Sequence, residues 1–214
     1  MSILIKSLNV NVHIIAVSET WETVSNSNYI FLPGYIKVSN SRQEGRKEGG
    51  VALLIKQNFD FTICDNYKIS SFESVFIELS GQVNSNKTII GAIYWPQNTD
   101  QLTFNIEFDN ILRSITIGCA SCILLGDYNI NLLNSSTDQE TGNFLNALFT
   151  NSVLPMITQP TRYGAQSATL IDNVITNKCL GQHLSGILLK TSPTTSQYFL
   201  LLEKFHLHAT RNIL

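Results

Sequence analysis

Short apolar segments rich in β-branched residues recur along the chain, and each is bounded by Gly, Asn, Ser or Pro. This pattern predicts strands at Val12–Val17, Gly50–Ile55, Val75–Leu79, Thr88–Tyr94, Cys122–Leu125, Leu170–Thr176 and Gln197–Leu202. Val75–Leu79 alternates between apolar and polar residues, whereas Ile123–Leu125 is continuously apolar, as in strands covered on both faces. The sequence therefore predicts a core dominated by strands, with further layers on both sides of at least one sheet.

Two segments have the periodicity of amphipathic helices. The first spans about residues 101–117, with an apolar face predicted at Leu102, Ile106, Leu112 and Ile115. The second spans about residues 138–150 and follows a Thr-x-x-Glu pattern at Thr137 and Glu140, which predicts a capping box. Because these helices alternate irregularly with the strands, a mixed α/β sandwich is favoured over a regular doubly wound sheet.

Length and composition predict a single globular domain. The chain has 214 residues, of which 43% are hydrophobic and 14% charged, enough apolar material for a substantial core. Its apolar stretches are shorter than the roughly 20 residues that cross a membrane, and Lys6, Asn9 and Asn11 interrupt the stretch where a signal peptide would need continuity. We therefore expect an intracellular protein that is not secreted and for which a nuclear location is possible. We expect its four cysteines to be reduced.

Charge gives no general indication of nucleic-acid binding. The formal net charge is −2, so tight binding through phosphate neutralisation alone is disfavoured. A nuclease remains compatible with this charge, because an enzyme that holds a divalent cation needs carboxylates at its site. The polar loop between Ser39 and Gly50 carries Arg42, Arg46 and Lys47; it is either a solvated loop or a cationic loop that holds a nucleic-acid backbone.

The most informative segment is an apolar strand that continues into Gly126-Asp127-Tyr128-Asn129. If the chain stays extended, alternation places Asp127 and Asn129 on the same side. An acid beside an amide at a strand end can orient a water molecule and bind a phosphoryl oxygen. The alternative is a simple turn, since Gly, Asp and Asn are common turn formers.

Two further acids belong to strands. Glu19 follows the first strand, where it is either a solvated carboxylate or a ligand for Mg²⁺, which prefers oxygen donors. Asp172 interrupts an otherwise apolar strand and, if buried, must be paired, hydrated or functional. A functional interpretation is harder to dismiss for three such acids in one chain than for one.

Seven blocks occur in order along the chain: Ile14–Trp21, Arg46–Ile55, Glu73–Glu78, Ile93–Pro96, Gly126–Asn129, Gln159–Arg162 and Ala168–Asp172. Their order and spacing resemble the LINE-like (non-LTR) retrotransposon endonucleases of the endonuclease/exonuclease/phosphatase superfamily. The resemblance covers about residues 4–202, and we expect one domain at residues 1–202 and a C-terminal tail at residues 203–214. It implies an α/β four-layer sandwich of two mixed β-sheets flanked by helices.

The resemblance also implies roles for individual residues, with DNA as the partner, one Mg²⁺ or Mn²⁺ as the cofactor, and a monomer. Glu19 would bind the metal, Tyr94 would contact the scissile phosphate, and Asp127 would align or deprotonate the attacking water. Asn129 would hold the phosphate or that water, and Asp172 would belong to the polar network near the metal. The residues expected to bind the substrate are Thr161, Thr169 and Arg46.

Two blocks of that family are not found. The segment Met1–Leu8 resembles a helix that normally follows an Asn-bearing first strand, so we expect that strand to be truncated. Where a Ser-Asp-His block is normal, the chain has Lys190–Ser196, which places Pro193 and Thr194, or Thr194 and Thr195, at the Asp and His positions. Threonine is not a general acid or base near pH 7, and losing such a group typically costs about 10²–10⁴ in rate. We therefore predict weak or no nuclease activity.

Three functions are compatible with these observations. The first is a metal-dependent DNA-nicking endonuclease of retrotransposon type with impaired activity. The second is a catalytically inactive remnant, or a domain of the same fold repurposed to bind nucleic acid or protein. The third is a phosphoesterase acting on a lipid or small-molecule phosphate.

Overall fold

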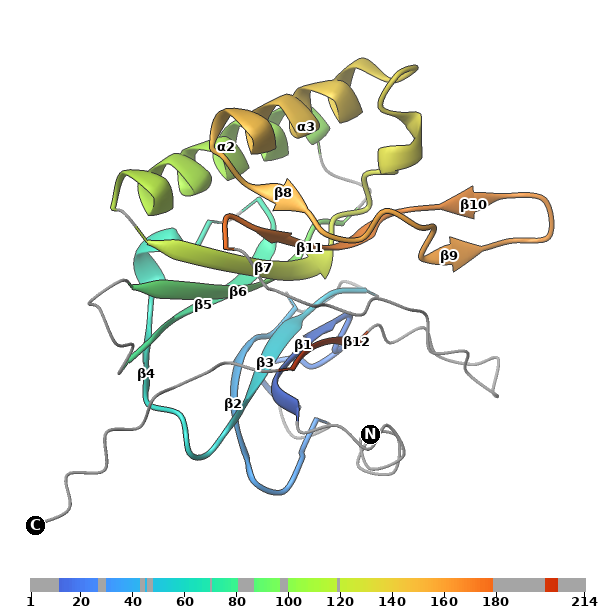
Figure 1. Ribbon diagram of the computed structural model, residues 1–214. Coiled ribbons are helices and arrows are strands. Elements are labelled where there is room, and N and C mark those ends of the chain that lie inside the picture. The colour runs from blue at the N-terminus through green and yellow to red at the C-terminus, as the bar shows by residue number, and fades with distance from the viewer. Residues whose placement is uncertain are drawn as a thin grey trace, which may run out of the picture.

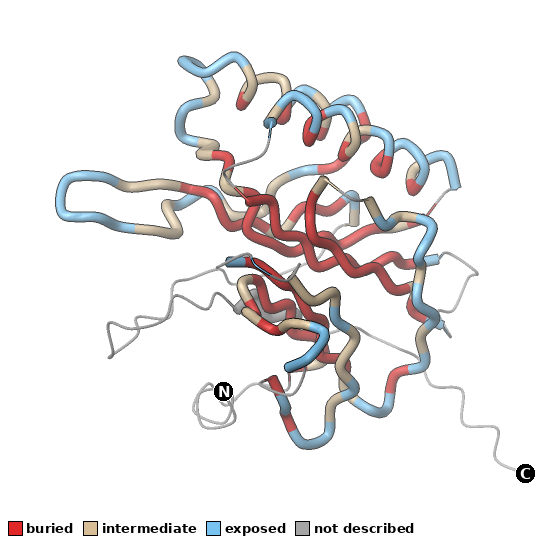
Figure 2. Tube along the Cα trace, turned by 180° about the vertical axis from the view of Figure 1, so that it is seen from behind, coloured by how far each residue is buried: buried red, intermediate tan, exposed pale blue. Residues whose placement is uncertain are grey.

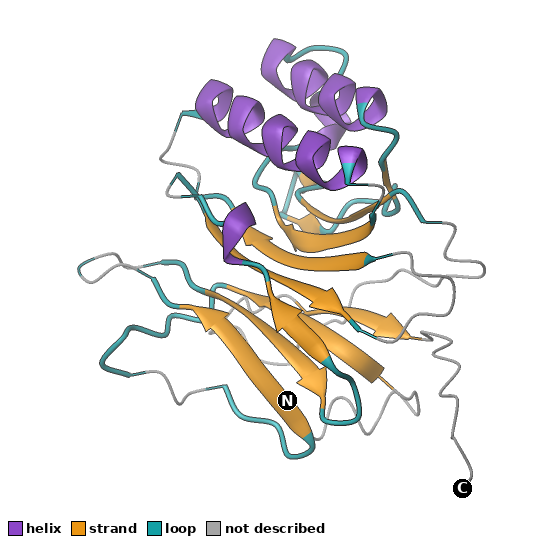
Figure 3. Cartoon of the chain, turned by 90° about the vertical axis from the view of Figure 1, so that its left-hand side faces the viewer, coloured by secondary structure: helices purple, strands orange, loops and turns teal. Residues whose placement is uncertain are grey.

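The computed structural model describes residues 12–26, 30–42, 45, 48–69, 71–80, 87–96, 100–118, 120–178 and 199–203. Within these residues two β-sheets pack face to face, and two α-helices cover the outer face of the larger sheet (Figures 1 and 3). The expected α/β architecture of two sheets flanked by helices is confirmed.

The smaller sheet has four strands in the order β12-β1-β3-β2. They are β12 (Phe199–Glu203), β1 (Val12–Ser18), β3 (Val51–Lys56) and β2 (Tyr35–Asn40). Each neighbouring pair is antiparallel. The strand β1 is therefore central and leads directly to Glu19 at its end.

The larger sheet has six strands in the order β4-β5-β6-β7-β11-β8. They are β4 (Phe61–Ile63), β5 (Glu73–Leu79), β6 (Thr88–Tyr94), β7 (Ser121–Asp127), β11 (Asp172–Thr176) and β8 (Leu154–Pro155). The sheet is mixed, because β6 and β7 are parallel and the other pairs are antiparallel. Parallel neighbours need a crossover connection, and the helix α2 (Gln101–Ile117) provides it.

Four shorter elements and a second α-helix complete the described chain. The 3₁₀-helices are η1 (Asp65–Tyr67) and η2 (Leu132–Asn134), and the second α-helix is α3 (Gln139–Thr150). The strands β9 (Arg162–Tyr163) and β10 (Ala168–Thr169) form a hairpin that extends beyond the edge of the larger sheet (Figure 1). Its root adjoins β11, so the hairpin projects from the sheet edge at which β7 ends.

The two helices differ in detail from the sequence expectation. On α2, Leu112 and Ile115 are buried as predicted, but Leu102 and Ile106 are 51% and 55% exposed. The buried face instead follows the phenylalanines Phe104 and Phe108, which present more apolar area to the sheet. The helix α3 is capped by the side chain of Asp138, which accepts from the N–H of Thr141, and the predicted capping by Thr137 is wrong. In the described residues no helix is long and apolar enough to cross a membrane.

Three apolar clusters are buried in the described structure, and two of them form the layers on either side of the larger sheet. One lies between the sheets, where the inward side chains of β1 and β3 meet those of β5, β6 and β7. The other lies between the larger sheet and the helices and contains a cluster of aromatic rings, including Phe104, Phe108, Tyr128 and Phe144. The strands β6 and β7 are covered on both faces and are buried along nearly their whole length (Figure 2). A polar group on these strands is therefore exposed to solvent, if at all, where the strands end.

Candidate active site

Strand register brings three of the predicted site residues into one row. Tyr94 on β6 is the Cα partner of Asp127 on β7, and Asp127 is the Cα partner of Asp172 on β11. Tyr94 and Asp127 are the last residues of their strands and Asp172 is the first of its own, so the row lies at one edge of the sheet. All three residues are at most 4% exposed. Directly paired residues on neighbouring strands have adjacent side chains, so these polar groups must interact.

Glu19 reaches this row from the other sheet. The hydroxyl of Tyr94 donates a hydrogen bond to Oε1 of Glu19 at 3.3 Å. Burial raises the pKa of the Glu19 carboxyl, as do the charges of Glu48 and Asp172, while the charge of Arg162 and the Tyr94 hydrogen bond lower it. The strand ends β1, β6, β7 and β11 thus form one polar region between the two sheets.

The backbone around Glu19 is fixed by two glycines. The two residues after Glu19 donate their N–H groups to the carbonyls of Gly50 and Gly49, at 3.0 and 2.9 Å. The N–H of Gly50 in turn donates to Oε2 of the buried Glu73, at 2.5 Å. A Cβ atom on Gly49 would lie 2.6 Å from the Glu73 carboxylate, and one on Gly50 would lie 2.2 Å from Oγ1 of Thr20. The Gly-Gly pair of the sequence block is therefore a steric requirement for the turn that carries Glu19.

Asp127 is held by both of its carboxylate oxygens. Oδ1 accepts the backbone N–H of Asn129 at 3.0 Å, and Oδ2 accepts Nη2 of Arg162 at 2.5 Å. Burial raises the pKa of Asp127 to about 7, with a further increase from the charge of Asp172 and an opposing effect from Arg162. At this pKa the group can both lose and accept a proton near neutral pH.

Asn129 is not placed by strand alternation. The strand β7 ends at Asp127, and Asn129 has a φ of 50°, in the left-handed region. The chain does not stay extended through Asn129, so the condition for placing both side chains on the same side is not met. The side chain of Asn129 donates through Nδ2 to the carbonyl of Trp95 at 2.6 Å, which joins the end of β7 to the end of β6.

Gly126 lies very close to the backbone of the neighbouring strand β6, one residue before Asp127. A Cβ atom at this position would lie 2.0 Å from the carbonyl oxygen of Ile93 on the neighbouring strand. Real Cβ atoms do not approach a backbone oxygen so closely, so any side chain here would push β6 and β7 apart. The glycine lets the two strands run together up to Tyr94 and Asp127.

Asp172 is the least satisfied of the acids. It is 4% exposed, and neither carboxylate oxygen has a hydrogen bond of normal geometry in the described structure. Its backbone N–H donates to Oγ1 of Thr161 at 3.3 Å, and Nε of Arg162 lies 3.9 Å from Oδ2. Burial raises the pKa of Asp172, whereas the Thr161 hydroxyl and the Arg162 charge lower it. A buried carboxylate of this kind is costly, because burial removes its hydration without replacing it fully.

Arg162 is the site residue that sequence reasoning did not select. It lies on β9, its side chain is 29% exposed, and it forms ion pairs with both Asp127 and Asp172. Its only sequence signal was its position next to Thr161 in a conspicuous block. Thr161 and Thr169 lie at the root of the hairpin, where the N–H of Thr161 donates to the carbonyl of Thr169 at 2.8 Å.

Several predictions fall outside the described residues, including those for the helix-like segment Met1–Leu8 and for most of the C-terminal tail at residues 203–214. Arg46 was expected to bind substrate, and its position is not among those described. The same holds for Lys190–Ser196, which stands where a Ser-Asp-His block was expected. The residues that the structure does bring together are Glu19, Tyr94, Asp127, Asn129, Thr161 and Asp172.

The donor atoms of this region fit a hard divalent cation. Glu19, Asp127 and Asp172 supply carboxylate oxygens, and both oxygens of Asp172 lack a hydrogen bond within the described structure. Across the described ranges, no three His, Cys, Asp or Glu side chains form a ready-made metal cluster. Mg²⁺ commonly binds through only one or two carboxylates and keeps several waters, so the residues present suffice for such a site.

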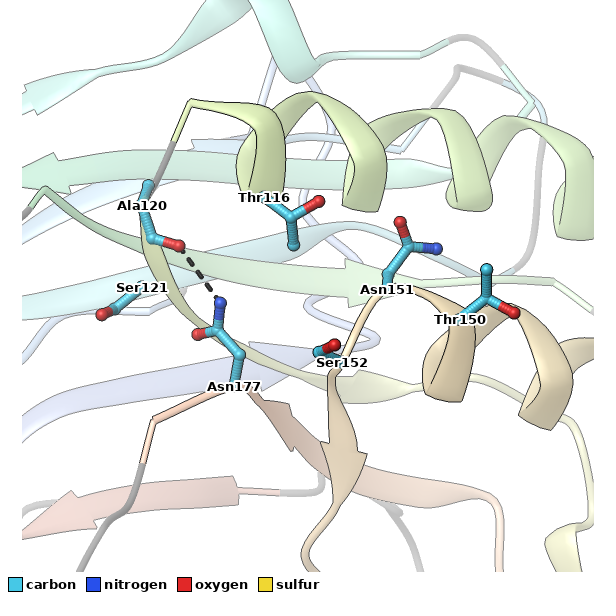
Figure 4. Close-up of a pocket in the computed structure, with 7 residues that line it drawn as sticks. All are labelled: Thr116, Ala120, Ser121, Thr150, Asn151, Ser152 and Asn177. Carbon is cyan, nitrogen blue, oxygen red and sulfur yellow. Dashed lines mark hydrogen bonds between the residues drawn. The ribbon is translucent and has the colours of Figure 1, made fainter.

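A hollow lies at the opposite end of the strands β7 and β11 (Figure 4). It has a volume of about 370 Å³ and is lined by Thr116, Ala120, Ser121, Thr150, Asn151, Ser152 and Asn177. Asn177 closes one side by donating to the carbonyl of Ala120 at 3.1 Å (Figure 4). None of the lining side chains is an acid, a base or a nucleophile of unusual reactivity. The strand ends at Asp127 therefore remain the better candidate for chemistry.

A two-sheet sandwich with buried acids at adjoining strand ends defines a class of phosphoester hydrolase folds, and sequence comparison agrees. The Endonuclease/Exonuclease/phosphatase family model matches residues 3–192, and the protein belongs to this family. No curated protein sequence matches the chain.

Solved structures of this fold are similar to the chain at low sequence identity. The AP endonuclease LMAP from Leishmania major has a TM-score of 0.61 and 11% identity over 77% of this chain and 69% of that one. The endonuclease domain of TRAS1, a telomere-specific non-LTR retrotransposon, has a TM-score of 0.53 and 12% identity over 67% of each chain. The 2′,3′-cyclic phosphatase ANGEL2 has a TM-score of 0.54 and 12% identity over 81% of this chain and 72% of that one. These likenesses show the fold, which serves more than one reaction.

Proposed function

We propose that the protein is a divalent-metal-dependent phosphodiesterase of the retrotransposon endonuclease type, which nicks DNA with impaired activity. The observation that carries this proposal is the row of Tyr94, Asp127 and Asp172, with Glu19 bonded to its first member. The seven ordered sequence blocks and the similarity in fold to the TRAS1 endonuclease domain support the same choice.

Glu19 would hold the metal. Its carboxylate lies where two sheets meet, and the glycine pair fixes the backbone on one side of it. A bound Mg²⁺ or Mn²⁺ would polarise a phosphoryl oxygen and stabilise the leaving alkoxide. Tyr94 orients Glu19 through its hydroxyl and lies beside Asp127, where a scissile phosphate would contact it.

Asp127 would align or deprotonate the attacking water. Both of its oxygens are held, so the direction of its remaining lone pairs is fixed before substrate binds. Burial raises its pKa to about 7, which suits proton transfer at neutral pH. Asn129 would bind the phosphate or the water, and Thr161, Thr169 and Arg46 would contact the nucleic acid. Hydrolysis would leave a 3′-hydroxyl at the nick.

The impairment rests on the segment Lys190–Ser196, which offers threonine where the family pattern has histidine. Without that histidine, the leaving group or the phosphate lacks one proton donor, and a loss of about 10²–10⁴ in rate is expected. The same observation favours a second candidate function, a domain of this fold that binds nucleic acid without cutting it.

Nicking of supercoiled plasmid DNA in Mg²⁺ tests the proposal. We expect slow conversion to the open circle, lost in Asp127→Ala and in Glu19→Gln, while Glu78→Gln, which changes an acid remote from this region, behaves like the natural chain. Rapid nicking that Asp127→Ala abolishes would contradict the impairment. Retention of DNA with no nicking at any metal concentration would replace the proposal by the binding function.

A further inference from the structure

Arg162 occupies an unusual position for a phosphate-cleaving site, because it neutralises the acids of the site itself. Its Nη2 lies 2.5 Å from Oδ2 of Asp127, and its Nε lies 3.9 Å from Oδ2 of Asp172. These two acids are direct Cα partners on neighbouring strands, so their carboxylates are close and repel each other. One guanidinium therefore compensates two facing carboxylates.

The backbone next to Arg162 is fixed relative to these acids. Oγ1 of Thr161 accepts the N–H groups of Ile171 and Asp172, both at 3.3 Å, and the N–H of Thr161 donates to Thr169 across the hairpin root. The arginine thus starts from a position tied to the strand that carries Asp172. A rigid base and a planar donor group favour one arrangement of the ion pairs over many.

The exposed fractions of the three side chains show how Arg162 differs from the two acids. The side chain of Arg162 is 29% exposed, whereas those of Asp127 and Asp172 are 0% and 5% exposed. Arg162 therefore has the most exposed side chain of the three residues. A hydrated cation that approached the two carboxylates would meet a fixed positive charge first.

Resting on the proposed function, in which Glu19 holds one divalent cation, we propose that Arg162 is a positioning residue that restricts the site to that single cation. Two buried carboxylates that face each other would otherwise form a second cation site. Without Arg162, both oxygens of Asp172 and Oδ2 of Asp127 would have no hydrogen-bond donor within the described structure, and only Oδ1 of Asp127 would keep one, the N–H of Asn129. The guanidinium takes the place of that second cation. It also keeps Asp127 free of metal and oriented for water.

The test counts Mn²⁺ ions bound per chain by electron paramagnetic resonance at pH 8, where protons compete least. We expect one ion for the natural chain, two for Arg162→Met, and one for Arg162→Lys, which keeps a positive charge. The second ion of Arg162→Met should disappear when Asp172→Asn is added and should remain when Glu19→Gln is added. Circular dichroism checks that each variant is folded, and Arg162→Gln replaces Arg162→Met if the latter is not.

The outcomes separate this inference from the proposed function. The same number of ions in Arg162→Met as in the natural chain would overturn the inference, and so would a second ion in Arg162→Lys. No ion in the natural chain and one in Arg162→Met, lost with Asp172→Asn, would support the inference while contradicting a metal at Glu19.

Discussion

Two buried carboxylates, those of Glu22 and Asp172, differ greatly in the hydrogen bonds and ion pairs that the fold provides for them. Glu22 is 0% exposed, and its oxygens accept Nζ of Lys37 at 2.9 and 3.0 Å, with the N–H of Ile30 as a third donor at 3.0 Å. Asp172 is 4% exposed, its carboxylate oxygens have no hydrogen bond of normal geometry within the described structure, and Nε of Arg162 lies 3.9 Å from Oδ2.

The difference in how these two carboxylates are paired distinguishes an acid that stabilises the fold from an acid that the fold leaves incompletely paired. A buried charge that is paired and fully hydrogen-bonded fixes the arrangement of the elements around it, here the loop after β1 and the strand β2. A buried charge that is left incompletely paired weakens the fold, and proteins tolerate such groups mainly at functional sites. Glu22 therefore belongs to the scaffold, whereas Asp172 and Asp127 belong to the candidate site that we propose.

The largest effect on stability is expected when the buried ion pair of Glu22 is broken. Lys37→Met keeps most of the side-chain volume but leaves Glu22 as a buried charge without its cation, which should lower the free energy of unfolding by about 3–5 kcal/mol. Urea unfolding followed by circular dichroism measures this. The matched control is Lys87→Met. Lys87 pairs with Glu78 at the surface, where the two side chains are 61% and 31% exposed, respectively. We expect this substitution to change the free energy of unfolding by no more than about 0.5 kcal/mol. Equal losses in the two variants would remove the distinction drawn for Glu22.

On the site side, Asp127→Asn should stabilise the protein in a pH-dependent way. The pKa of Asp127 is raised to about 7 from an ordinary value of 3.8, so the folded protein holds this proton more tightly than the unfolded chain. The stability that the proton provides is complete below the ordinary pKa and is lost as the pH rises through about 7, by at most about 1.4 kcal/mol per pH unit. The free energy of unfolding of Asp127→Asn should therefore exceed that of the natural chain by an amount that grows between pH 5 and pH 7 and then levels off. Unfolding curves at pH 5, 6, 7 and 8 would show it, and an advantage that shrinks with pH would contradict the assigned direction.

A smaller gain in the free energy of unfolding is expected for Asp172→Asn. The amide removes the charge that raises the pKa of Asp127, while Arg162 keeps its contact with Asp127 at 2.5 Å. We expect the free energy of unfolding at pH 8 to rise by about 1 kcal/mol. Thermal unfolding of the two proteins side by side measures the difference. A loss as large as that of Lys37→Met would mean that Asp172 is a scaffold residue after all.

Much of this arrangement could be predicted from local sequence. The strands β1, β3, β5, β6, β7 and β11 follow β-branched segments, and the acids Glu19, Asp127 and Asp172 lie at the ends of three of them, as predicted. The strands β2, β4, β8, β9 and β10 were missed because most are two or three residues long or lie at sheet edges, where periodicity has too few positions to be seen.

The parts that sequence could not supply depend on contacts between distant segments. The register that sets Asp127 opposite Asp172 joins residues far apart in the chain, and no local pattern specifies it. Arg162 was missed for the same reason, since its role follows from where the hairpin root lies. The buried face of α2 was misjudged because neighbouring phenylalanines, not the spacing of Leu102 and Ile106, decided which side packs.

The most direct test of the account measures stability and nicking on the same pair of samples at pH 8, the natural chain and Asp127→Asn. If the incompletely compensated acids are retained for chemistry, Asp127→Asn should unfold at higher urea concentration and should have lost the slow Mg²⁺-dependent nicking of plasmid DNA. A variant that is less stable than the natural chain, or that nicks at the natural rate, would contradict the claim that Asp127 belongs to a catalytic site.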